Sequence, residues 1–186
     1  MKTSDADILF VPGLGGSGPD HWQTRWAARL STARLIEQND WAAPTRDEWV
    51  AAVVAAVEAC ARPVVLVGHS LGSAAIAHAA PFFTAGKARG AMLVAPPDAA
   101  TAQRVPGLGA IARDFALETV SKLPFTSVLV ASRNDPLSSY EASEELARGL
   151  GAKLLDAGEA GHINADSGHG PWPEGLMSFA GFLKGL

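Results

Sequence analysis

The chain has 186 residues, of which 48% are hydrophobic and 18% charged, and its formal net charge is −4. This length favours one domain, residues 1–186, whose core is large enough to be stable alone. The weak negative charge provides no basic stripe for nucleic acid and no polybasic segment for a membrane, so we expect a small-molecule partner. Because Cys60 is the only cysteine, an internal disulfide and a cysteine-based zinc site are excluded.

The first apolar run, at residues 7–11, follows an acidic start and is too short for a signal sequence or a membrane-spanning helix. We therefore expect a soluble, cytoplasmic protein. Further apolar runs recur along the chain, each followed by turn residues and a helical pattern, and this alternation predicts an α/β fold with a parallel sheet covered by helices on both faces. The predicted strands are residues 7–11, 34–38, 64–67, 91–94, 127–131 and 152–156.

Helix starts are indicated by capping boxes, in which an N-cap oxygen is paired with a side chain three residues later. The three pairs are Asp20 with Gln23, Thr45 with Glu48, and Ser138 with Glu141. Residues 45–60 carry apolar side chains at helical spacing, which predicts a core-facing helix. The Pro- and Gly-rich segment 95–124 contains one short helical pattern, at residues 108–117, and is too small for a cap domain.

The pentapeptide Gly68-His69-Ser70-Leu71-Gly72 lies between a predicted strand and an Ala-rich predicted helix. This is the setting of a nucleophile elbow, in which a strained turn exposes a serine and glycines avoid collisions with the neighbouring strand and helix. We therefore expect Ser70 to be a nucleophile. The alternative is a glycine-bracketed turn whose serine only caps the helix.

A serine nucleophile needs an imidazole as base and an acid that orients it. Asp135 and His162 each follow a predicted strand, and the order Ser70, Asp135, His162 is that of α/β-hydrolases. Two alternatives remain open at this point. Asp135 precedes a proline and could simply initiate a turn, and His169 competes with His162 as the base.

Acyl transfer also requires backbone N–H groups that bind the oxyanion. Leu71 follows the nucleophile and supplies one, and the glycine-rich loop after the first strand supplies the other, with Leu14 preferred and Gly15 next. The substrate-binding candidates are Gly13, Gly15, His69 and Trp172. Of these, His69 is expected to pack beside the nucleophile and Trp172 to lie near a pocket.

The same loop supports a different hypothesis. Gly13, Gly15 and Gly18 match a dinucleotide-binding fingerprint, with Glu37 where a ribose-binding acid would lie. Pro19 delays the following helix, however, whereas a pyrophosphate site needs a helix N-terminus within the glycine cluster. His162, Asp166 and His169 match no metal-binding spacing. We expect neither a metal nor another cofactor.

These motifs together resemble the small serine hydrolases of the retinoblastoma-binding-protein-nine and YdeN type. The resemblance runs nearly end to end and rests on residues 11–17, 20–23 and 26, the elbow, 134–136, 161–164, 167–168 and 170–175. It implies an α/β-hydrolase of about six strands without the fold's first two antiparallel strands or a cap domain, and a catalytic triad of Ser70, Asp135 and His162. The Leu-x-Cys-x-Glu motif for a retinoblastoma-type partner is absent around Cys60, so that partner is not expected.

The residues and the resemblance predict a serine hydrolase of the carboxylesterase type that cleaves small carboxylic esters through an acyl-enzyme on Ser70. The missing cap predicts an open site that favours short acyl groups. An alternative is a non-catalytic protein-interaction module on the same fold, because fold alone does not fix function.

Overall fold

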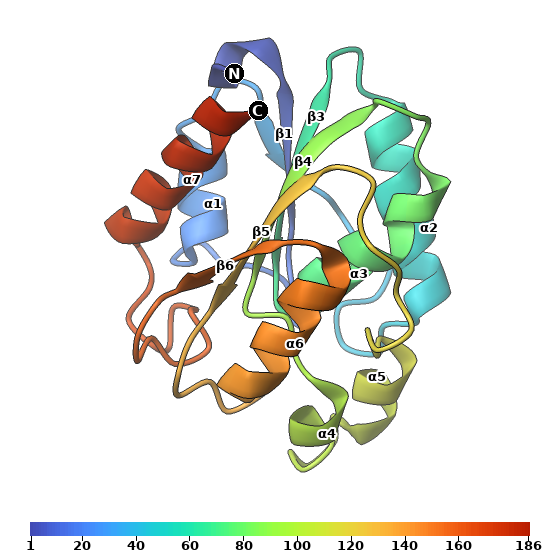
Figure 1. The fold of residues 1–186 in the computed structure, drawn as a ribbon, viewed down its shortest axis with the longest axis vertical. Coiled ribbons are helices and arrows are strands. Elements are labelled where there is room, and N and C mark those ends of the chain that lie inside the picture. Colours follow the sequence, from blue (N-terminus) through green and yellow to red (C-terminus); the bar gives the residue numbers. More distant parts are fainter.

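All 186 residues are described in the computed structural model, in which the strands form one sheet with the order β2-β1-β3-β4-β5-β6 (Figure 1). All neighbouring strands are parallel, as predicted. The strands are β1 (Asp7–Val11), β2 (Ala33–Leu35), β3 (Val64–His69), β4 (Ala88–Val94), β5 (Thr126–Ala131) and β6 (Lys153–Asp156). β2 is shorter than predicted, because β1 is its only neighbour and their register ends at Leu35.

Helices cover both faces of the sheet, with α1 and α7 on one face and α2, α3 and α6 on the other (Figure 1). The α-helices are α1 (Trp22–Ala27), α2 (Arg46–Glu58), α3 (Leu71–Ala79), α4 (Ala99–Ala102), α5 (Gly109–Asp114), α6 (Tyr140–Leu150) and α7 (Pro173–Gly185). Two 3₁₀ turns are η1 (Thr3–Asp5) and η2 (Ala80–Phe82). No helix is both long enough and apolar enough to cross a membrane.

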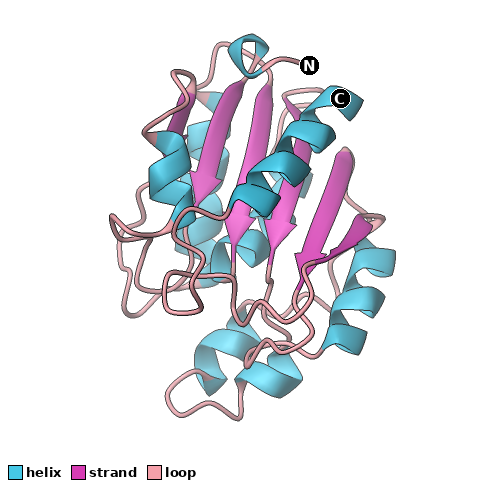
Figure 2. Cartoon of the chain, turned by 90° about the vertical axis from the view of Figure 1, so that its left-hand side faces the viewer, coloured by secondary structure: helices cyan, strands magenta, loops and turns pink.

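The strands are apolar on both faces because each face is buried under helices. In β3, Val64 and Leu66 belong to the core beneath α2, α3 and α6, whereas Val65 and Val67 belong to the core beneath α1 and α7. Figure 2 shows the strand arrowheads pointing away from the end that carries both termini. The loops at the carboxyl ends of the strands therefore gather at one edge, where α4 and α5 also lie and no cap domain is present.

The predicted cap of α1 is wrong by one residue. His21, not Asp20, is the N-cap, and its Nδ1 accepts the N–H of Gln23 at 3.2 Å. The Gln23 amide does not reach back to Asp20 but donates to the carbonyl oxygens of Val11 and Val67 at 3.2 and 3.1 Å. This fully buried glutamine thus ties the start of α1 to the ends of β1 and β3.

The caps of α2 and α6 also differ in detail from the prediction. Thr45 is the N-cap of α2, but its hydroxyl contacts the Glu48 carboxylate at 2.7 Å rather than a backbone N–H. In α6 the N-cap is Ser139 and not Ser138, because the Ser139 hydroxyl accepts the N–H of Ala142 at 3.1 Å.

Candidate active site

Ser70 occupies a strained turn between β3 and α3. Its φ of 53° and ψ of −124° lie in a region that side-chain-bearing residues rarely adopt. The two glycines of the pentapeptide make this turn possible, because a Cβ on Gly68 would lie 2.7 Å from the Ser73 backbone and one on Gly72 would overlap the Val11 carbonyl. The expected strand-turn-helix elbow is therefore present.

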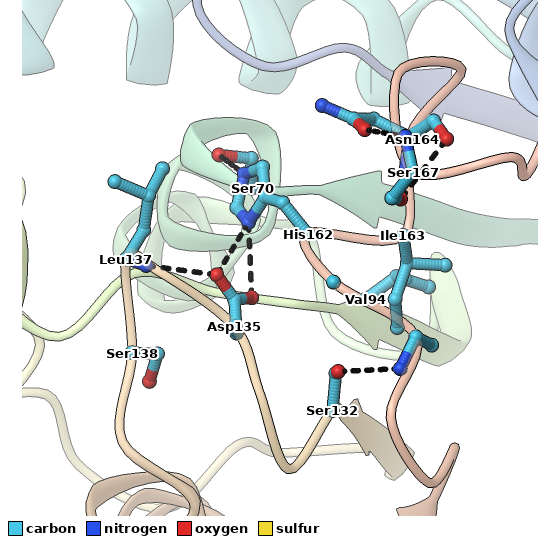
Figure 3. Close-up of polar contacts among 12 residues, drawn as sticks. Ser70, Val94, Ser132, Asp135, Leu137, Ser138, His162, Ile163, Asn164 and Ser167 are labelled. Carbon is cyan, nitrogen blue, oxygen red and sulfur yellow. Dashed lines mark hydrogen bonds and ion pairs between the residues drawn. The ribbon is translucent and has the colours of Figure 1, made fainter.

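The side chains of Ser70, His162 and Asp135 form one hydrogen-bonded chain (Figure 3). His162 Nε2 lies 2.8 Å from Ser70 Oγ, and His162 Nδ1 lies 2.9 Å from both carboxylate oxygens of Asp135. Because the carboxylate can only accept when ionised, Nδ1 carries the proton and Nε2 is free to accept the serine hydroxyl proton. The Asp135 side chain is 2% exposed and that of His162 is 12% exposed.

The loops that carry Asp135 and His162 are bonded to each other through two side chains. Asn134 Oδ1 accepts from Gly161 N–H at 2.7 Å and from the Ser132 hydroxyl at 2.9 Å, and Ser132 Oγ accepts from Ala160 N–H at 2.9 Å. These bonds fix the spacing of the acid and the base. Sequence reasoning assigned no role to Ser132 or Asn134, although Asn134 is part of the motif that carries the family resemblance.

The turn hypothesis for Asp135 holds alongside its contact with His162, since Asp135 Oδ1 also accepts from Leu137 N–H at 2.9 Å. His169, the competing base, makes no hydrogen bond with Ser70. Its Nδ1 lies 3.2 Å from Ser167 Oγ, and the residue does not line the cavity beside Ser70.

Two further histidines surround the base. His69 Nε2 lies 2.8 Å from the carbonyl oxygen of His162 and must donate to it, because a carbonyl only accepts. Burial holds the pKa of His69 well below its usual value. The His21 ring lies 4.8 Å from that of His69, and burial, followed by the charge of His162, lowers the pKa of His21 to about 4. Both rings are therefore neutral at pH 7.

The loop after β1 lies directly against the serine. A Cβ on Gly13 would approach Ser70 Cβ to 2.9 Å, so only glycine permits this contact. Gly15 N–H donates to the Trp41 carbonyl at 2.9 Å, whereas Leu14 N–H has no acceptor in the protein. Leu71 is the first residue of α3, where the N–H has no partner within its helix. The N–H groups of Leu14 and Leu71 are thus both free to donate to a ligand.

A cavity of about 490 Å³ opens beside Ser70. Among its lining residues are Gly13, Leu14, His21, His69, Ser70, Leu137, His162, Asn164 and Asp166. Gly15 and Trp172 do not line it, so the structure does not place these two substrate-binding candidates at the site. Trp172 is 5% exposed and stacks on Trp26 with 5.6 Å between ring centroids, so it is a core residue between α1 and α7.

The geometry does not support the dinucleotide hypothesis. α1 begins only at Trp22, beyond the glycine cluster, so no helix N-terminus faces a bound pyrophosphate there. Gly13 instead packs on Ser70. No group of three or more His, Cys, Asp or Glu side chains has an arrangement suited to a metal ion.

The parallel sheet and the serine at its central elbow define a protein of the α/β-hydrolase class. The serine hydrolase family model matches residues 8–181, and the chain belongs to that family. A protein from Pectobacterium atrosepticum described as a YdeN-like hydrolase is 36% identical with a TM-score of 0.82, covering 97% of this chain and 92% of its own. This confirms the predicted YdeN-type resemblance.

Two further solved structures share the fold at lower identity. The ydeN gene product of B. subtilis is 19% identical, with a TM-score of 0.75 and coverage of 96% of this chain and 99% of its own. The esterase domain of a Rhodothermus marinus protein is 18% identical, with a TM-score of 0.68 and coverage of 94% and 86%. No curated protein sequence matches the chain at a significant level.

Proposed function

We propose that this hydrolase cleaves small carboxylic esters through an acyl-enzyme on Ser70. The observation that carries the proposal is the hydrogen-bonded chain from Ser70 Oγ through His162 to the buried Asp135 carboxylate. A similar fold in a protein described as an esterase domain adds support for ester chemistry. The partner is a small acyl substrate, with no role for nucleic acid or a membrane, and the cytoplasmic location expected from the sequence stays a prediction.

In the proposed reaction Ser70 Oγ attacks the ester carbonyl while His162 Nε2 takes its proton. Asp135 holds the ring and stabilises the imidazolium, and the N–H groups of Leu14 and Leu71 bind the oxyanion. The C–O bond of the alcohol then breaks as His162 returns the proton to the leaving oxygen. Water, activated by the same imidazole, releases the acid and restores the serine.

A fluorophosphonate probe tests the nucleophile. The wild-type protein should be labelled and Ser70→Ala should not. The control Ser31→Ala, which removes an exposed serine in the turn before β2, should be labelled like the wild-type protein. The labelled peptide, identified by mass spectrometry, should contain Ser70. A well-folded wild-type protein that takes no label would favour the non-catalytic interaction module instead.

Replacing Asp135 with Asn tests the acid. The asparagine amide can donate to Nδ1 instead of accepting from it, which favours the tautomer with the proton on Nε2. His162 can then no longer take the Ser70 proton, and kcat for p-nitrophenyl acetate should fall by about 10⁴. The circular dichroism spectrum should stay that of the wild-type protein. A drop of less than tenfold would remove Asp135 from the proposed mechanism.

A further inference from the structure

Ser70 lies between two hollows of different chemistry. One is the cavity of about 490 Å³ lined by His162, His21 and Asn164. The other is a small cavity of about 40 Å³, lined by Ser70 and otherwise only by apolar residues. Its walls include Leu14, Leu71, Leu108, Ile111, Ala112 and Leu137. Leu14, Ser70 and Leu137 line both cavities, so the serine faces each of them.

The direction of proton transfer indicates which cavity takes the alcohol part of an ester and which takes its acyl chain. The leaving oxygen of an ester must receive its proton from His162 Nε2, so the alcohol part has to lie on the side of Ser70 that His162 lines. That side is the polar cavity. The oxyanion is bound between Leu14 and Leu71 in the proposed mechanism, and the remaining substituent of the carbonyl carbon is the acyl chain. The apolar cavity is the space left for it.

We infer that the small apolar cavity beneath α4 and α5 is an acyl-binding pocket that limits the substrate to esters of two- or three-carbon acids. This inference rests on the proposed esterase function. The reaction stays as described above: the Ser70 Oγ to acyl carbon bond forms, the bond to the alcohol oxygen breaks, and the proton moves from Ser70 through His162 to that oxygen.

The volume sets the chain length. An engineered cavity of about 150 Å³ binds benzene, which has six carbon atoms, so by proportion a cavity of about 40 Å³ admits one or two carbon atoms. Those atoms are the methyl group of an acetyl ester or the ethyl group of a propionyl ester. A longer chain would have to displace the walls, which protein interiors resist, or leave its further methylene groups outside the pocket.

The wall contributed by α5 is held by the core. Ala112 is buried, and Phe115, directly after α5, is 2% exposed with its ring 5.6 Å from that of Trp49 in α2. Ile111 and Leu108 face the pocket while remaining half-buried. Shortening either of these two side chains should therefore enlarge the pocket while the buried Ala112 and Phe115 keep the segment anchored.

A chain-length series tests the pocket. With p-nitrophenyl acetate, propionate, butyrate and hexanoate, kcat/KM of the wild-type enzyme should fall about tenfold or more for each methylene beyond propionate. Ile111→Ala and Leu108→Ala should each raise the butyrate-to-acetate ratio of kcat/KM by about tenfold. Val120→Ala is the matched control: Val120 is also half-buried against the same core but lies outside the pocket, so the ratio should not change.

The outcomes separate this inference from the function on which it rests. Absence of both ester turnover and Ser70 labelling in the wild-type protein would overturn the esterase function and the pocket with it. Ester turnover with no preference for short chains would overturn the pocket alone. The same holds if Ile111→Ala and Leu108→Ala change the ratio no more than Val120→Ala does.

Discussion

At the scale of single residues, the site contains three neighbouring imidazoles of which one is placed to act as base. His162 contacts Ser70, whereas His69 uses its Nε2 proton to hold the His162 carbonyl, and His21 caps α1. A second cation beside a protonated His162 would be unfavourable, because like charges at this separation repel strongly in a buried site. Because His69 and His21 stay neutral, they do not repel the positive charge that His162 acquires when it acts as base.

The same neutrality makes stability depend on pH. The unfolded His21 binds a proton below pH about 6.5, but the folded residue does so only near its pKa of about 4. The unfolded state thus carries more protons in this window, and the free energy of unfolding should decrease as the pH falls from about 6.5 to about 4. The contribution of His21 is at most about 3 kcal/mol.

Urea unfolding at several pH values from 7.5 to 4.5 measures this effect. His21→Asn keeps a side chain that can cap α1 but cannot titrate, so the slope of unfolding free energy against pH should be shallower than in the wild-type protein by up to one proton. Equal slopes in the two proteins would show that His21 binds its proton equally in both states.

At the scale of elements, the β3-turn-α3 unit depends on the approach of α3 to the end of β1. A methyl group at Gly72 would overlap the Val11 and Pro12 carbonyl oxygens, so Gly72→Ala should lower the free energy of unfolding by more than about 2 kcal/mol. Gly181, a helical glycine in α7 with open space around it, provides the control. Gly181→Ala should raise stability by about 0.5 to 1 kcal/mol.

Thermal and urea denaturation of both variants check this pair. The comparison tests packing, because each substitution adds a methyl group to a helix and only at Gly72 does that group meet neighbouring backbone. A Gly72→Ala protein as stable as Gly181→Ala would mean that α3 can move away from β1 without cost.

Much of the element plan was predictable from the sequence because buried parallel strands are continuous apolar runs bounded by turn residues. The elbow was predictable for a similar reason, since its glycines and serine are adjacent in the chain. The caps were less predictable, because the Gln23 side chain donates to the carbonyl oxygens of Val11 and Val67, which are distant in sequence. The burial of Trp172 against Trp26 and the bridging role of Asn134 depend on tertiary contacts in the same way.

At the scale of the whole molecule, charge favours some leaving groups over others. The chain carries a net charge of −4, and the polar cavity is lined by Asp20 and Asp166 but by no Lys or Arg. Asp20 is paired with Arg25 at 2.6 Å, whereas Asp166 makes no ion pair. An acetate ester of a cationic amino alcohol should therefore have a kcat/KM several-fold above that of an equally long ester bearing a carboxylate.

This preference should shrink as salt is raised from about 0.01 to 0.5 M, because exposed charges are screened. Asp166→Asn should reduce the preference at low salt, and an uncharged acetate ester of the same length should be unaffected by the substitution. A preference for the carboxylate-bearing ester would contradict the prediction.

The bonds from Ser132 and Asn134 to the His162 loop also have a consequence for how the enzyme fails. Asp135 and His162 follow β5 and β6, the outermost strands at one side of the sheet, whereas Ser70 follows the central β3. Loops and the edge strand β6 open locally at a lower cost than the buried strands. Because Ser132 and Asn134 hydrogen-bond the two loops together, local opening of these loops would move Asp135 and His162 away from Ser70 as a pair. Heating should then abolish the activity reversibly before the rest of the sheet unfolds.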